Sequence, residues 1–279
     1  MKDRIEEFER TKDYLVCVDS DGCAIDAMTI KHEKCFGPKA IEVWHLEEYQ
    51  DRFMDEWMKV NCFSRTRGIN RFKALVAVFE NLRNEGLDIP DLSTVKQWTE
   101  TTTELSNPSL ERELAKTNDE QLKLTLDWSI RTNQAIAELP KSKPFPHVKE
   151  GLQFVHEHAD IAIVSSANSE AVVAEWTEHG LDAYVSVLCG QEAGSKQYCI
   201  GQLMEKGSYL KTHVLMIGDA PGDLKAAEAN DVLYYPIIPG KEAESWKRLV
   251  EEAIGKFLEG IYQGAYQKQL IEEFYDVLK

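Results

Sequence analysis

The stretch Tyr14-Leu-Val-Cys-Val-Asp-Ser-Asp-Gly-Cys-Ala-Ile-Asp26 joins five β-prone apolar residues to two carboxylates one residue apart, Asp19 and Asp21. Buried parallel strands are nearly continuous apolar runs, and open α/β sheets bind ligands beyond the carboxyl ends of their strands. The stretch therefore predicts a central strand that ends in acids at the functional edge of a sheet. An acidic turn without a function is the alternative, because Asp and Gly are common turn residues.

The second half of the chain alternates between strand-like and helix-like segments. We expect further strands at residues 161–164, 184–188, 213–217 and 232–235, each followed by helical sequence. Strands that alternate with helices at this spacing are typical of βαβ units. The predicted fold is therefore a three-layer α/β/α core around a parallel sheet, with a Rossmann-like topology.

Between the first two strands the pattern is helical. One stripe at helical spacing joins Phe72 to Leu82 and ends near Gly86, and another joins Leu122, Leu126 and Ile130. We predict an all-helical domain over residues 27–140, inserted after the first strand.

The rest of the chain then divides as follows. Residues 1–26 and 141–240 form the α/β core, beginning with a short polar helix or arm over residues 1–13, and residues 241–279 form a C-terminal helical extension packed on the core.

Composition excludes several function classes. Lys and Arg number 32 against 48 Asp and Glu, a net charge of −16, which argues against a nucleic-acid partner because such proteins carry a basic patch. No segment has the pattern of a membrane span or a signal peptide. The six cysteines are scattered without a Cys-x-x-Cys pair, and the seven histidines show no ligand spacing. We expect a cytoplasmic protein with reduced, buried thiols.

Polar residues follow three of the predicted strands, and a lysine follows a fourth. They are Asp19 and Asp21, Ser165 and Ser166, Lys196, and Asp219 and Asp223. The carboxyl ends of parallel strands share one edge, so these side chains should converge. Four neighbouring carboxylates repel one another unless a cation lies between them, and hard oxygen ligands suit Mg²⁺. A lysine and a hydroxyl add what a transferred phosphoryl group needs.

This order of motifs resembles the haloacid dehalogenase superfamily of phosphotransferases. The motifs are Asp19-Ser-Asp21-Gly22, Ser165, Lys196 and Gly218-Asp219-Ala-Pro-Gly-Asp223. The resemblance covers residues 14–26 and about 145–238, and the helical insertion resembles the family's C1-type cap.

The resemblance implies a role for each residue. Asp19 would be the nucleophile that forms an aspartyl-phosphate, and Asp21 the general acid and base. Ser165 and Lys196 would hold the phosphoryl oxygens. The residues that would bind Mg²⁺ are Asp19, the backbone carbonyl of Asp21, Asp219 and Asp223, the last as a ligand or a partner of the ligands.

Three of these assignments have alternatives in the sequence. Ser166 could take the place of Ser165, and either serine, or Asn168 or Ser169, could merely cap the next helix. Lys196 could be a solvated loop residue. Asp223 could be the N-cap of its helix, a role compatible with metal binding.

The resemblance implies Mg²⁺-dependent hydrolysis of a small phosphorylated metabolite, because family members that act on halides or phosphonates lack the acid at position 21. A phosphomutase of the same family, or a phospho-aspartate switch without turnover, is the alternative. In the insertion, Arg65 and Arg67 are candidates for contact with an anionic substrate, whereas Arg71 and Lys73 are expected on the polar face of a helix. Nothing in the sequence indicates the oligomeric state.

Overall fold

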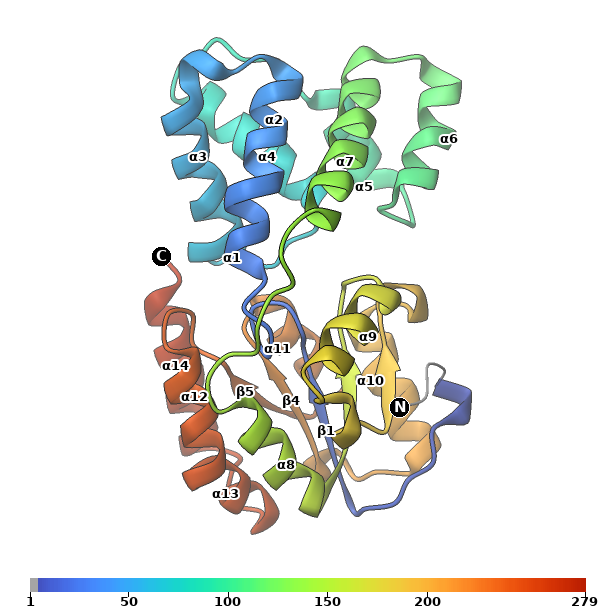
Figure 1. Ribbon diagram of the computed structural model, residues 1–279, viewed down its shortest axis with the longest axis vertical. Coiled ribbons are helices and arrows are strands. Elements are labelled where there is room, and N and C mark those ends of the chain that lie inside the picture. The colour runs from blue at the N-terminus through green and yellow to red at the C-terminus, as the bar shows by residue number, and fades with distance from the viewer. Residues whose placement is uncertain (1–4) are drawn as a thin grey trace. The chain divides into compact units, whose positions relative to one another are not determined.

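The computed structural model describes residues 5–279, which separate into two compact units (Figure 1). One unit holds the chain up to Ala27 together with Lys141–Lys279, and the other is Met28–Pro140. The first four residues of the expected N-terminal arm lie outside the described residues, and the rest of it contains one 3₁₀ turn, Ile5–Glu7. Across residues 5–279, no helix combines the length and the apolar character that crossing a membrane requires.

The first unit is built on a five-stranded sheet in the order β3-β2-β1-β4-β5, with every neighbouring pair parallel. The strands are β1 Tyr14–Val18, β2 Ala159–Val164, β3 Val187–Cys189, β4 Val214–Gly218 and β5 Leu233–Pro236. The predicted α/β fold with a parallel sheet is confirmed. Because Val18 lies level with Ile163 of β2 and Ile217 of β4, these three strands end together.

The third strand is shorter than predicted. Residues Asp182–Tyr184 form a 3₁₀ turn instead, in which the N–H of Val185 donates to the carbonyl of Asp182 at 3.2 Å. The strand pairing begins only at Val187. The β-prone side chains of this segment pack equally well in a turn, so residue type alone does not locate the strand's start.

Helices cover both faces of the sheet, as Figure 1 shows. The helices whose side chains join the cluster on the Val16 and Val18 face include α8 Val148–His158, α9 Ser169–Glu178, α12 Glu242–Arg248 and α13 Ile254–Leu258, the last two joined by a π-helical turn, Leu249–Ala253. On the Leu15 and Cys17 face lie α10 Lys196–Gly207 and α11 Pro221–Ala229. Burial on both faces explains the continuous apolar run of β1.

The last helix, α14 Ala265–Val277, lies along the edge strand β5. The backbone N–H of Tyr234 donates to Oε1 of Gln267 at 3.0 Å, and its carbonyl accepts from the hydroxyl of Tyr262 at 2.7 Å. Unpaired edge strands invite pairing with other chains. The C-terminal segment therefore satisfies hydrogen-bonding groups that this edge would otherwise expose.

The second unit is entirely helical over its described elements. Its α-helices are α1 Met28–Lys31, α2 Gly37–Trp44, α3 Gln50–Met58, α4 Arg71–Asn84, α5 Ser93–Thr101, α6 Asn107–Thr117 and α7 Glu120–Ala137, and its π-helical turns are His32–Phe36 and Lys59–Phe63. Aromatic rings fill its core, with Trp57 and Trp128 fully buried. The predicted stripe from Phe72 to Leu82 lies on α4 and is buried.

The stripe predicted on α7 is partly wrong. Leu122 is buried, but Ile130 is 40% exposed, and the buried face instead passes through Thr125, Trp128 and Ser129. The hydroxyl of Thr125 donates to a carbonyl one turn earlier at 2.7 Å, and that of Ser129 donates to Asn107 at 2.6 Å. Hydrogen-bonded hydroxyl groups can be buried at little cost, so this face of α7 is less apolar than a hydrophobic stripe.

Candidate functional site

Three buried carboxylates converge at the carboxyl edge of the sheet. Asp19 follows β1, Asp219 follows β4, and Asp223 lies in the first turn of α11. Each offers an oxygen that lies within 4.8 Å of the others, and none of the three residues is more than 6% exposed. The N–H of Asp19 donates to the carbonyl of Ile217 at 3.0 Å, so the pairing of β1 with β4 aligns the two strand ends.

Lys196 joins two of these acids. It is the first residue of α10, whose N-cap is Ser195. Its Nζ lies 2.7 Å from Oδ2 of Asp19 and 2.5 Å from Oδ1 of Asp223, and its side chain is 14% exposed. Lys196 is therefore an ion-paired residue of this cluster and not a solvated loop lysine.

The ionisation of this cluster is set by burial and by the lysine. Burial raises the pKa of Asp19 to about 6, although the positive charge of Lys196 lowers it. Burial also raises the pKa of Asp223, again against the effect of Lys196. Burial alone would lower the pKa of Lys196, but the two carboxylates outweigh it and hold that pKa above its usual value. The single positive charge of Lys196 thus offsets only part of the negative charge that three ionised carboxylates would carry.

Asp223 has a second role in the local structure. Its Oδ2 accepts from the backbone N–H of Ala220 at 3.0 Å, while Oδ1 binds Lys196. The N-cap of α11 is Ala220, so Asp223 is not the N-cap residue. Asp223 is the third residue of the helix, and its carboxylate reaches back to the N-cap N–H. Gly218 makes this possible, because a Cβ there would lie 2.3 Å from Cγ of Asp223.

A Gly218→Ala substitution is expected to displace Asp223 and to lower activity at least tenfold, with a loss of about 1–3 kcal/mol in the free energy of unfolding from overpacking. Gly222→Ala, in the first turn of α11, is the matched control, because a Cβ at Gly222 would have no neighbour within 4 Å. Steady-state rates and chemical denaturation of both variants check this. Equal activity of the two variants would contradict it.

The loop after β2 places two serines differently. Ser165 is 3% exposed, and its Oγ accepts from the N–H of Ala167 at 3.2 Å, whereas Ser166 is exposed. The cap of α9 is Asn168, whose Oδ1 accepts from the N–H of Ala171 at 3.2 Å. Of the four residues that could cap this helix, Asn168 does so, and Ser165 lies at the strand end beside β1.

Sequence reasoning missed Glu192, which holds this loop from the segment after β3. Its carboxylate accepts from Nδ2 of Asn168 at 2.6 Å, and from the N–H and the hydroxyl of Ser169 at 3.0 and 2.6 Å. Glu192 lies four residues before Lys196 in the chain. Its hydrogen bonds therefore tie the loop after β2 to the loop that leads to Lys196. An acid in a polar loop carries no signal that would identify such a partner.

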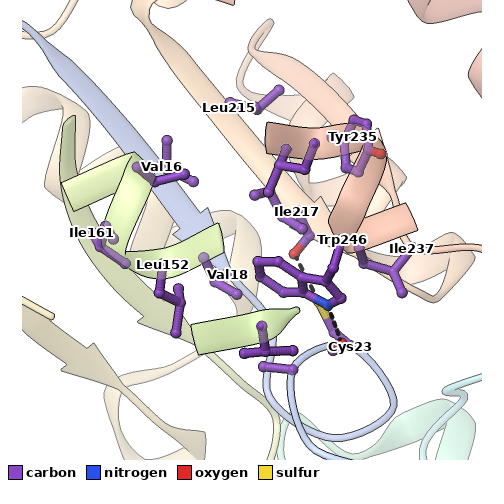
Figure 2. Packing of buried hydrophobic residues seen from close by; sticks show 14 of the residues in the cluster. Val16, Val18, Cys23, Leu152, Ile161, Leu215, Ile217, Tyr235, Ile237 and Trp246 are labelled. Carbon is purple, nitrogen blue, oxygen red and sulfur yellow. Dashed lines mark hydrogen bonds between the residues drawn. The ribbon is translucent and has the colours of Figure 1, made fainter. Parts of the chain in front are cut away.

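The turn that follows β1 holds Asp21, which is half-buried. The carbonyl of Ser20 accepts from the N–H groups of Ala24 and Ile25, both at 2.9 Å. Two tryptophans also bind this turn. Nε1 of Trp176 donates to Oγ of Ser20 at 3.0 Å. Nε1 of Trp246 donates to the carbonyl of Cys23 at 2.9 Å, as Figure 2 shows. Nothing in the sequence paired either tryptophan with this turn.

The residues present fit a divalent cation. The three acids Asp19, Asp219 and Asp223 offer only oxygen atoms, all near one another and all buried. Mg²⁺ prefers oxygen ligands and is bound through a few carboxylates. Buried acids that are only partly compensated by a lysine are stabilised by such a charge.

A family comparison agrees with this geometry. The family model described as haloacid dehalogenase-like hydrolase matches residues 69–235, more than half of the 279-residue chain. The chain belongs to the haloacid dehalogenase-like hydrolases. The match includes Ser165, Lys196 and Asp219 but begins after β1, so the location of Asp19 rests on the sheet and the contacts described above.

Individual relatives match this chain over part of its length or at low sequence identity. A phosphoglycolate phosphatase of Vibrio vulnificus (strain YJ016) is 32% identical over 127 residues, 44% of this chain and 52% of the relative. The chain thus spans about half the length of the curated relatives that it matches.

Among solved structures, a haloacid dehalogenase-like hydrolase from Bacteroides fragilis has a TM-score of 0.54 at 15% identity, over 84% of this chain and 93% of that one. A protein described as a predicted phosphoglycolate phosphatase from Haemophilus somnus 129PT has a TM-score of 0.53 at 15% identity, over 81% and 85%. These similarities show the shared fold.

The arginines of the basic segment 65–73 in the helical unit differ in their exposure. Arg65 is exposed, whereas Arg67 is 4% exposed and its Nη1 donates to the carbonyl of Cys62 at 2.7 Å. Of the two residues expected on the polar face of α4, Lys73 is exposed, whereas Arg71 is half-buried: its guanidinium lies 4.9 Å from the ring centre of Phe36 and donates to Asn133 at 2.6 Å. Packing against an aromatic ring explains this, because arginine stacks on such rings.

His32 makes the helical unit sensitive to acid. Nε1 of Trp57 donates to Nδ1 of His32 at 3.2 Å, and an indole N–H can only donate, so this nitrogen carries no proton. Burial, with the charges of Arg67 and Arg71, lowers the pKa of His32 to about 3. The unfolded side chain has a pKa of about 6.5.

Lowering the pH from 7 to 5 should therefore destabilise the protein, because in this range the unfolded state binds a proton that the folded state does not. The expected loss is at most about 1.4 kcal/mol per pH unit below pH 6.5. Denaturation at both pH values, for the wild type and for His32→Gln, checks this. The variant should lose less stability on acidification, and an equal loss would refute the role of His32.

Proposed function

We propose that this chain is a phosphomonoester hydrolase that acts through an aspartyl-phosphate on Asp19. The observation that carries the proposal is the contact of Lys196 with both Asp19 and Asp223 at the strand ends, because a lysine beside a buried acid suits an anionic phosphoryl group. Membership of a family of hydrolases supports the same reaction class.

In the first step, a carboxylate oxygen of Asp19 attacks phosphorus, and the bond between phosphorus and the ester oxygen breaks. Asp21 donates a proton to the leaving oxygen, so that an alcohol departs. In the second step, water attacks the phosphorus of the aspartyl-phosphate while Asp21 takes up a proton. Inorganic phosphate leaves and the carboxylate of Asp19 is restored.

The other residues would bind and orient the phosphoryl group. Lys196 would neutralise its charge, and Ser165, or Ser166 in its place, would donate a hydrogen bond to an oxygen. The residues that would hold Mg²⁺ are Asp19, the carbonyl of Asp21, Asp219 and Asp223. When bound, Mg²⁺ supplies positive charge against the phosphoryl oxygens.

The substrate class is a small phosphorylated metabolite. The curated relatives are named phosphoglycolate phosphatases, which makes phosphoglycolate the first ester to test. In the helical unit, Arg65 suits contact with an anionic substrate better than Arg67, because Arg65 is exposed and Arg67 is buried.

The test is phosphate release from phosphoglycolate, hexose phosphates and other small esters, with Mg²⁺ and then with a chelator. Release that depends on Mg²⁺ and is lost in Asp19→Asn would support the proposal. A folded protein that releases no phosphate would overturn it. Transfer of the phosphoryl group between two hydroxyls of one sugar would then indicate a mutase, and a stable phospho-Asp19 after incubation with acetyl phosphate would indicate a switch.

A further inference from the structure

A buried polar pair lies directly behind the catalytic acids proposed above. Ser20 stands between Asp19 and Asp21, and its Oγ accepts from Nε1 of Trp176 at 3.0 Å. Both Ser20 and Trp176 have no exposed surface. Trp176 belongs to the apolar cluster on the face of β1 that holds Val16 and Val18. Its bond thus places the hydroxyl of Ser20, in the turn just after β1, against this apolar cluster.

Such a pair is a directional contact in an apolar core. An indole N–H can only donate, and leaving it without an acceptor costs about 1–3 kcal/mol. Apolar contacts tolerate sliding, whereas a buried hydrogen bond fixes the distance and direction between two groups. The pair therefore restrains the position of Ser20 relative to α9 more tightly than apolar packing would.

The pair connects two parts of the proposed phosphoryl site. The N–H of Ser20 donates to Oδ1 of Asp19 at 2.8 Å, and the carbonyl of Ser20 closes the turn that contains Asp21. Trp176 lies on α9, the helix that follows the loop of Ser165. One side chain–side chain bond thus links the turn of the two acids to the helix that follows the loop of Ser165.

We propose that Ser20 and Trp176 are positioning residues, whose hydrogen bond sets the turn of Asp21 relative to the phosphate-binding loop. This inference rests on the proposed function, since it concerns the same site. A displacement of an acid or a phosphate ligand by about 1 Å is enough to slow a reaction a hundredfold. The bond acts on the reaction and contributes little to ground-state binding, so it should affect kcat more than KM.

Trp176→Phe tests the bond most cleanly, because it removes the N–H and keeps an aromatic ring. We expect kcat to fall at least tenfold with KM within about threefold of the wild type. Ser20→Ala should reduce kcat similarly, and the double variant should lose no more than the worse single variant, because one bond is broken in all three.

Tyr235→Phe is the matched control for stability. The hydroxyl of Tyr235 donates to the carbonyl of Ser245 at 2.6 Å, and both residues are 1% exposed. Tyr235 lies in the same apolar cluster as Trp176 but binds no part of the β1 turn. The control should lower the melting temperature by loss of a buried hydrogen bond in the same cluster, with kcat unchanged. Wild-type kcat in Trp176→Phe, or an equal fall in the control, would overturn the proposal.

Hydrogen exchange gives a readout that does not need activity. In Trp176→Phe, amides of residues 20–25 should exchange at least tenfold faster than in the wild type, and in Tyr235→Phe they should not change. If the wild type hydrolyses no ester, the proposed function fails, but the exchange of residues 20–25 still decides the positioning role. Equal exchange of this segment in the two variants would overturn it.

Discussion

An Asp19→Asn variant is expected to release phosphate at least a thousandfold more slowly than the wild type and to keep its fold. An amide is a poor nucleophile and cannot form an aspartyl-phosphate, and removal of a nucleophile costs roughly a thousandfold or more in related covalent mechanisms. The side chain of Asn is nearly isosteric with Asp, so its packing at the end of β1 should be preserved.

The stability of this variant should not fall. Burial raises the pKa of Asp19 to about 6, so at neutral pH the folded protein holds an acid that burial disfavours in its charged form. A neutral amide removes this cost. Denaturation of the variant at pH 7 checks its stability. Intact mass should show a phosphorylated Asp19 in the wild type and no phosphorylation of the variant, and near-wild-type turnover by a folded Asp19→Asn would remove the mechanism.

Asp160→Asn is the control for a buried carboxylate remote from the site. Asp160 is the second residue of β2, at the amino edge of the sheet. It accepts from the N–H groups of Thr11 and Lys12 at 2.8 and 2.9 Å and from the hydroxyl of Tyr209 at 2.5 Å. Its substitution should cost about 1–3 kcal/mol of stability and leave kcat unchanged. The two variants together separate loss of chemistry from loss of fold.

Substitution of Lys196 by Met should have the second largest effect. It would leave Asp19 and Asp223 buried without their shared cation, and breaking a buried ion pair by removing one partner costs about 3–5 kcal/mol. We also expect at least a hundredfold loss of activity, because the proposed neutralisation of the phosphoryl group is lost.

The loss of stability in Lys196→Met should depend on pH. Burial raises the pKa of both carboxyl groups in the folded state, and removal of the lysine would raise them further. The folded variant then binds more protons than the unfolded chain, so its stability falls as the pH rises from about 4 to 8. Denaturation of the metal-free variant at pH 5 and pH 8 should show the larger loss at pH 8.

Lys211→Met is the comparison for a surface ion pair. Lys211 lies 2.7 Å from Asp231, and both side chains are more than half exposed. Exposed pairs contribute about 0–1 kcal/mol, so this variant should retain wild-type activity and nearly all of its stability. An equal, pH-independent loss in both variants would show that the Lys196 contacts are no stronger than a surface pair.

Much of the site follows from the sequence because it depends on a single rule of topology. Asp19, Ser165 and Asp219 each follow an apolar run, and parallel strands bring their carboxyl ends to one edge. No contact had to be known to predict that these residues converge. The order of the runs along the chain was sufficient, because helices between the strands make the sheet parallel.

Side-chain roles within the site required the tertiary structure. Whether Lys196 is solvated or paired depends on acids that are 27 residues or more away in the chain. Arg67 and Arg71 have the same charge and stand four residues apart, yet Arg67 is buried and donates to the nearby carbonyl of Cys62, whereas Arg71 packs on Phe36 and donates to Asn133. Residue type and spacing carry no information about such partners.

The sequence by itself determined the alternation of strands and helices, the helical insertion and the acids at the strand ends, since these depend on periodicity and on neighbours along the chain. Only the tertiary structure decided the helix cap at Asn168, the buried face of α7 and the bond between Ser20 and Trp176. The last of these joins residues 156 positions apart. Its formation depends on how α9 packs against the sheet, and packing of this kind is a property of the folded chain as a whole.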